Sequence, residues 1–201
     1  DLKNETGFEF ATALEHEFTL LHEDFKPQLC MTLDALRDVD PLPELLLWAL
    51  NQAGIQMEAF EPEFGSGQYE LSCSHLWGIE AIDKAIVTRE IVRDIARHCG
   101  FRATFSPKVA PDQVGNGAHI HFSLKDEKNS PVLYDDKNDN CLSEVGNQFV
   151  AGVIHHINSI IPFAASSPLS YMRLGPGKWS SGSNAFGPGN REAVIRICDL
   201  P

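Results

Sequence analysis

Residues 114–124, Val-Gly-Asn-Gly-Ala-His-Ile-His-Phe-Ser-Leu, constrain the fold most strongly because their second half alternates between polar and apolar side chains. Successive side chains of a strand point to opposite faces, so His119, His121 and Ser123 share one face and the apolar residues share the other. Glycines before the strand permit a turn. The stretch predicts a strand with polar, ligand-capable groups on one face. Taken alone, it is explained better by a half-exposed strand whose histidines meet water.

A second alternating stretch covers residues 8–21 and predicts another strand. Glu15 and Glu17 share one of its faces, and apolar residues occupy the other. Carboxylates at adjacent positions of one face repel each other unless a cation or solvent separates them. A lone Glu-x-Glu is more often a solvated face. His16 falls on the apolar side, where we expect a hydrogen-bonded structural residue.

Residues 56–71 contain Pro and Gly at positions that predict two short extended pieces around a turn. Glu63 and Glu70 flank this turn, which would bring both carboxylates to one point. Gln68, Glu70 and Ser72 share a face of the second piece. An acidic exposed loop would have a similar composition, so this signal is weak by itself.

The composition limits the function classes. The chain has 201 residues and a formal charge of -12, with 28 acidic against 16 basic residues, which argues against a nucleic-acid partner. No apolar run approaches the roughly 20 residues that span a bilayer, and residues 1–4 lack a signal-peptide pattern. The five cysteines are scattered, as expected for free thiols in a reducing cytosol. We therefore expect a cytoplasmic protein with no membrane partner.

Three stretches are predicted to be helices. Asp40 is expected to cap a helix that continues to Gln52, with Trp48 in the core. Apolar spacing predicts a second helix over residues 80–98, and Ser143 is expected to cap a third through about Ile161. His155 and His156 are adjacent in it, so a surface or core-edge position is expected. Strands with ligands on one face and helices on the other predict an α+β fold with an antiparallel sheet, in one domain over residues 1–201.

The ligand-capable residues favour a particular chemistry. Several glutamates with one imidazole suit Mg²⁺ or Mn²⁺ better than Zn²⁺. Arg173, Arg191 and Arg196 lie on Gly- and Pro-rich loops or on the predicted strand 193–197. Guanidinium groups there suit carboxylate or phosphate recognition, although salt bridging in an acidic protein explains them equally well. Two divalent ions beside arginines would suit phosphoryl transfer.

Six segments in chain order carry a more specific pattern. They are residues 14–18 (Leu-Glu-His-Glu-Phe), 63–70 (Glu-Phe-Gly-Ser-Gly-Gln-Tyr-Glu), 103–108 (Ala-Thr-Phe-Ser-Pro-Lys), 115–124, 170–177 (Ser-Tyr-Met-Arg-Leu-Gly-Pro-Gly) and 190–196. Together they resemble the catalytic domain of the glutamine synthetase family over nearly the whole chain. The resemblance implies a curved antiparallel sheet lined with metal ligands and covered by helices on its outer face.

The resemblance also implies roles for the polar residues. One divalent ion would be held by Glu17, Glu63 and Glu70, and the other by Glu15 and His119. The ATP phosphates would be contacted by His121, Ser123 and Arg196. The amino-acid substrate would be contacted by Gly115 and Arg173. The catalytic arginines facing the phosphoryl group would be Arg191 and Arg173. In the family, ATP phosphorylates the γ-carboxylate of glutamate, and ammonia or an amine then displaces the phosphate.

Four departures from the family pattern shape the expected function. The family's small N-terminal domain and the Glu and Arg that follow at the C-terminal end are absent, so we expect a partial catalytic domain that is inactive alone. Ammonia-using members carry a glutamate after the first arginine segment, where this chain has Lys178-Trp179, and they usually read Gly-Ser-Gly-Met at 115–118. These differences favour an amine other than ammonia. The resemblance implies that the intact protein forms a homo-oligomeric ring.

Two other functions remain open. A non-catalytic, glutamine-synthetase-like structural or binding protein would keep the fold, but it has no need of mutually repelling carboxylates. A His-x-His metallohydrolase would need more His or Asp ligands downstream than His155 and His156 provide.

Overall fold

The computed structural model describes residues 2–22 and 30–198. The described chain divides into two compact units. One runs from Phe10 to Phe122, and the other combines the residues up to Glu9 with those from Ser123 onward. Each unit is described by itself below.

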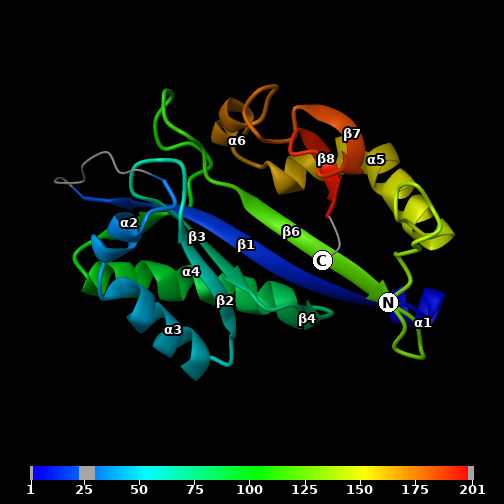
Figure 1. Ribbon diagram of the computed structural model, residues 1–201, viewed down its shortest axis with the longest axis horizontal. Coiled ribbons are helices and arrows are strands. Elements are labelled where there is room, and N and C mark those ends of the chain that lie inside the picture. The colour runs from blue at the N-terminus through cyan, green and yellow to red at the C-terminus, as the bar shows by residue number, and fades with distance from the viewer. Residues whose placement is uncertain (1, 23–29, 199–201) are drawn as a thin grey trace. The chain divides into compact units, whose positions relative to one another are not determined.

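The first unit is built around a sheet whose central strand is β1 (Glu9–Leu21). The other strands are β2 (Met57–Pro62), β3 (Gln68–Cys73), β4 (Leu76–Trp77), β5 (Arg102–Thr104) and β6 (Ala118–Lys125). Their order is β2-β3-β1-β4, with β5 and β6 also paired to β1 (Figure 1). The pairs β1–β3, β1–β4, β1–β5 and β2–β3 are antiparallel. The α+β fold with an antiparallel sheet is confirmed.

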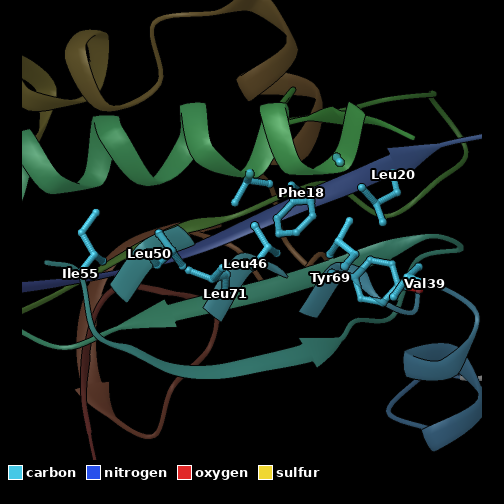
Figure 2. Packing of buried hydrophobic residues seen from close by; sticks show 11 residues of the cluster. Phe18, Leu20, Val39, Leu46, Leu50, Ile55, Tyr69 and Leu71 are labelled. Atoms are coloured by element: carbon cyan, nitrogen blue, oxygen red, sulfur yellow. The ribbon is translucent and has the colours of Figure 1, made fainter. Parts of the chain in front are cut away.

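Helices cover the apolar face of this sheet. They are α2 (Leu33–Arg37), α3 (Leu42–Gln52) and α4 (Glu80–His98). The buried core joins Phe18 and Leu20 of β1, Tyr69 and Leu71 of β3, Leu42, Leu46 and Leu50 of α3, and Val92 and Ala96 of α4. Figure 2 shows these side chains meeting in one cluster. The helices therefore pack on the side of β1 opposite Glu15 and Glu17, as predicted.

Some predictions for α3 and α4 are wrong. The side chain of Asp40 does not cap α3, because the N-cap residue is Pro41 and no side chain makes a capping hydrogen bond. Trp48 is 63% exposed rather than in the core, because the buried stripe of α3 runs through Leu42, Leu46 and Leu50. The apolar spacing that predicts a helix over residues 80–98 also predicts that Ile86 lies on its buried side, but Ile86 is 60% exposed.

His16 is buried as predicted, but not in the predicted way. Its side chain is among the least exposed polar groups, at 3%. Neither ring nitrogen has a hydrogen-bond partner within the described residues. The ring instead meets the edge of Phe105, with centroids 6.0 Å apart. Burial, followed by the charge of Arg89, lowers the pKa of His16 to about 4, which keeps the imidazole neutral.

The second unit contains α1 (Leu2–Thr6), α5 (Glu144–Ala164), α6 (Pro168–Arg173), β7 (Ser183–Pro188) and β8 (Ala193–Ile197). Ser143 caps α5 as predicted, because its hydroxyl accepts a hydrogen bond from the Gly146 N–H. The predicted strand at 193–197 is confirmed, but its partner β7 is parallel to it. Leu142, Val150 and Ile195 form the core of this unit.

Among the described residues, no helix combines the length and the apolar character that crossing a membrane would need.

Candidate metal centre

The polar face of the sheet collects the predicted glutamates from three strands. Glu15 and Glu17 point to this face from β1, and Glu70 of β3 lies directly opposite Glu17 in the register. Glu63 follows the last residue of β2, where the hairpin turns into β3. His119 reaches the same face from β6, whose entry is fixed by the Glu17 N–H donating to the Gly117 carbonyl at 3.1 Å. The predicted turn between Glu63 and Glu70 therefore brings both carboxylates to one place.

These side chains form two groups that could each hold a metal ion. One group consists of Glu15, Glu70 and His119, and the other of Glu17, Glu63 and Glu70. Within each group, one ligand atom from every residue lies within 4.8 Å of the others. Glu70 belongs to both groups, so the two candidate positions adjoin. The residues are those that the resemblance implied, with Glu70 now facing both positions.

Histidines offset the charge of Glu15. Its carboxylate lies 3.2 Å from His119 Nδ1 and 2.9 Å from His121 Nε2. Hydrogen bonding from His119 and then from His121 holds the pKa of Glu15 well below its usual range. His121, predicted at the ATP phosphates, thus contacts the acidic face from the same side as His119.

The pKa shifts in the opposite direction at Glu63 and Glu70. Burial raises the pKa of Glu70 to about 7, and the charges of Glu15 and Glu17 add to the effect. Burial also raises the pKa of Glu63, with Glu17 as the next cause. Half-buried carboxylates this close to one another are not all ionised unless positive charge lies nearby. Oxygen donors with one imidazole are what Mg²⁺ or Mn²⁺ prefers, so the donor set fits a hard divalent cation.

Two buried amides at this site were not singled out from the sequence. Gln68 Nε2 lies 3.0 Å from Glu17 Oε2, and at the same distance from the Gly115 carbonyl. Asn116 Oδ1 is a third acceptor at 3.0 Å. Alternation placed Gln68 on the same face as Glu70, which was the available signal. Gly115, predicted at the amino-acid substrate, is thereby tied to the glutamate face.

The remaining predicted site residues belong to the other compact unit. Arg173 ends α6, Arg191 lies just before β8 and Arg196 lies on β8. Ser123 lies on β6, just past the division between the units. Their meeting with the glutamates stays a prediction. His155 and His156 are exposed on α5, as predicted, and belong to neither group of possible ligands found in the described residues.

The loop after α6 is organised by a single carboxylate. Glu192 accepts hydrogen bonds from the Gly177 N–H at 3.0 Å and the Trp179 N–H at 2.9 Å, one at each oxygen. Lys178 Nζ donates to the Met172 carbonyl at 2.9 Å. The stretch from Leu174 to Gly189 contains no acidic residue. The only carboxylate that the described contacts show on this loop is therefore engaged by its backbone.

The fold and the acidic face define an α+β domain whose antiparallel sheet carries adjoining carboxylate groups suited to hard cations. Comparison with known proteins makes this class specific. Residues 1–200 match the family model for the glutamine synthetase catalytic domain. The chain therefore belongs to the glutamine synthetase family.

Individual relatives agree with this assignment. Type-1 glutamine synthetase 1 of Dictyostelium discoideum is 31% identical over 100% of this chain and 43% of its own length. The γ-glutamylpolyamine synthetase of Streptomyces coelicolor is 36% identical over 76% of this chain and 32% of its own length. A crystal structure described as a novel glutamine synthase homologue superposes with a TM-score of 0.92 at 40% identity, over 98% of this chain and 47% of that one. The chain thus spans less than half the length of each.

Proposed function

We propose that the protein containing this chain is an ATP-dependent ligase that joins the γ-carboxylate of glutamate to an amine through γ-glutamyl phosphate. The pair of adjoining groups that share Glu70 is the observation that carries this proposal. A phosphoryl transfer between two anions needs concentrated positive charge, and this face provides the ligands that would gather it. The homo-oligomeric ring and the cytoplasmic location remain predictions.

Each residue of the acidic face has a role in the proposal. Glu17, Glu63 and Glu70 would hold one Mg²⁺ or Mn²⁺, and Glu15 with His119 the other. When bound, such ions neutralise phosphate oxygens and align the nucleotide with the attacking carboxylate. The histidines keep Glu15 ionised, which leaves it available as a ligand.

The proposed substrate contacts come from the predicted positions. Gly115 would contact glutamate by its backbone, and Arg173 would bind its carboxylate through the planar guanidinium fork. The groups proposed at the phosphates of ATP and the transferred phosphoryl group are His121, Ser123, Arg191 and Arg196. Arginine suits this role because its charge persists through the whole reaction.

The acceptor is proposed to be an amine other than ammonia, with ammonia as the alternative. The loop at Lys178-Trp179 lacks the glutamate that ammonia-using members carry there, and Glu192 is bonded to its backbone. Because backbone N–H groups of the loop already engage both oxygens of Glu192, we propose that this carboxylate does not attract ammonium and remove its proton. The γ-glutamylpolyamine synthetase among the relatives shows that the family includes a synthetase named for a polyamine product.

An amine screen tests the proposal. The intact protein is supplied with Mg²⁺, ATP and glutamate, and ADP release is measured with ammonia, short alkylamines and polyamines in turn. We expect turnover that requires both glutamate and an amine, with an organic amine preferred over ammonia. Glu70→Gln should abolish it. Glu44→Gln, an exposed carboxylate in the first turn of α3, is the matched control and should be unaffected.

The screen also separates the rival functions. ATP and Mg²⁺ binding without turnover for any amine would favour a non-catalytic family member. Preference for ammonia would keep the ligase proposal and overturn the assignment of the acceptor. Hydrolysis that needs no ATP would favour a metallohydrolase.

A further inference from the structure

Beneath the acidic face lies a connected pair of buried carboxamides. Gln68 is 3% exposed and Asn116 is 5% exposed. The Gln68 amide nitrogen has two protons and faces three acceptors, namely Glu17 Oε2, the Gly115 carbonyl and Asn116 Oδ1, each at 3.0 Å. One side chain therefore touches both a candidate metal ligand and the candidate substrate loop.

Glu17 presents its two oxygens to different partners. Oε2 accepts the Gly117 N–H at 2.7 Å and the Gln68 amide at 3.0 Å. Oε1 is the oxygen nearer to His119, at 3.7 Å from Nε2. Because Oε2 already has two donors, Oε1 is the atom that Glu17 can offer to a cation.

The two amides are held at their far ends as well. Asn116 Nδ2 donates to the Ser106 carbonyl at 2.9 Å, and Asn116 Oδ1 accepts from the Thr19 hydroxyl at 3.2 Å. Gln68 Oε1 accepts the Gly65 N–H at 2.8 Å. These contacts orient both carboxamides, so neither can rotate without losing bonds in a buried setting.

We propose that the Gln68 carboxamide is a positioning group that fixes Glu17 as a single-oxygen ligand and couples it to the backbone of Gly115. The inference rests on the proposed function for the identity of the two ligands, a divalent cation at Glu17 and glutamate at Gly115. Because this one amide donates to both Glu17 and the Gly115 carbonyl, a ligand that shifts either group also changes the hydrogen bond to the other. By linkage, glutamate then tightens cation binding and the cation tightens glutamate binding by the same factor.

Removing the amide tests the proposal. Mn²⁺ binding to the protein is measured calorimetrically with and without glutamate, for the parent and for Gln68→Met, which keeps the length and removes the donor. We expect the Mn²⁺ Kd to rise about 10- to 100-fold, the range found when groups that orient metal ligands are removed. The effect of glutamate on that Kd should disappear.

A matched control distinguishes the loss of a positioning group from the general loss of stability that removing a buried hydrogen bond causes. Thr88 of α4 is 1% exposed, and its hydroxyl donates to the Lys84 carbonyl at 2.8 Å on the helix side of the sheet. Thr88→Val removes a buried hydrogen bond, as Gln68→Met does, and should leave the Mn²⁺ Kd and its response to glutamate within about twofold of the parent.

A second variant keeps the test decisive if Gln68→Met does not fold. A Cβ added at Gly65 would lie 2.8 Å from Gln68 Oε1, the end of a flexible side chain, so Gly65→Ala should displace the carboxamide while the fold persists. It should weaken Mn²⁺ binding in the same direction. Parent-like Kd and glutamate response in either folded variant would overturn the inference alone. A parent that binds no Mn²⁺ would overturn the proposed function, and this inference with it.

Discussion

The two faces of β1 are made from alternate residues of one strand, yet the side chains on them have different surroundings. Phe18 and Leu20 are buried against helices and complete a core. Glu15 and Glu17 approach Glu70 across the sheet, where burial, followed by the charges of Glu15 and Glu17, raises the pKa of Glu70. One face is therefore complete in the chain itself, whereas the other is suited to a cation. Stability and function should be separable by substitutions on opposite faces.

The largest effect is expected on the helix face. Phe18→Ala removes a fully buried ring that touches Phe60, Tyr69 and Phe105. We expect the free energy of unfolding to fall by about 3–5 kcal/mol, measured by urea denaturation. Ile120→Ala, at a side chain 55% exposed, is the control and should change it by less than about 0.5 kcal/mol. Equal losses in the two variants would contradict the assignment of the core.

The next effect is expected on the acidic face. Glu70→Gln removes the carboxylate shared by both groups, and we expect Mn²⁺ affinity to fall on the order of 100-fold or more, about 2.7 kcal/mol. Calorimetric titration of the protein measures it, with Glu44→Gln as the control. An unchanged stoichiometry and Kd would exclude Glu70 as a shared ligand.

In the metal-free protein, Glu70→Gln is expected to change how the free energy of unfolding depends on pH. The pKa of Glu70 rises from 4.5 to about 7 on folding, so the native state binds more protons than the unfolded chain between these values. Stability contributed by protonated Glu70 is therefore present below about pH 4.5 and is lost as the pH rises toward 7. We expect the metal-free parent to lose stability over this window more steeply than Glu70→Gln, measured by thermal unfolding at several pH values.

Much of this comparison could be predicted from the sequence, because alternation within a strand is local. The period of two placed Glu15 and Glu17 on one face of β1 and His119 and His121 on one face of β6. Pairing is not local. That Glu70 lies opposite Glu17 depends on the β1–β3 register, which no spacing along the chain determines. Only the resemblance implied that the two glutamates share an ion.

The buried amides escaped prediction for the same reason. Gln68 acts on residues 51 and 47 positions away in the chain, and Asn116 on Thr19, 97 positions away. Alternation placed Gln68 on the face of Glu70 but did not indicate its burial, and nothing in the neighbours of Asn116 distinguishes it from an exposed polar residue. His16 shows the reverse case, since its burial was predicted from alternation but its lack of hydrogen-bond partners depends on what packs around it.

A smaller effect is expected from His16, the polar residue on the apolar face. Its pKa falls from 6.5 to about 4 on folding, so only the unfolded chain gains a proton as the pH falls between these values. Stability from neutral His16 is complete above pH 6.5 and is lost toward pH 4. We expect His16→Leu to flatten this loss and to stabilise the protein by about 1–3 kcal/mol at pH 5, because it removes unsatisfied buried nitrogens. Urea denaturation at pH 5 and pH 7.5 measures both changes, and a parent-like pH profile would contradict the prediction.

The smallest effect on the free energy of unfolding is expected from Trp48, an apolar residue of α3 that is exposed. Apolar residues crowd α3, so spacing alone does not identify its buried side. The structure does, because Leu46 is fully buried while Trp48 is 63% exposed. Trp48→Gln should therefore change the free energy of unfolding by no more than about 0.5 kcal/mol, whereas Leu46→Ala should cost about 2–5 kcal/mol. Urea denaturation of the two variants compares them directly. A loss at Trp48 as large as that at Leu46 would mean that the exposed side of α3 is covered in the intact protein, and the helix face of the sheet would then also be incomplete in this chain alone.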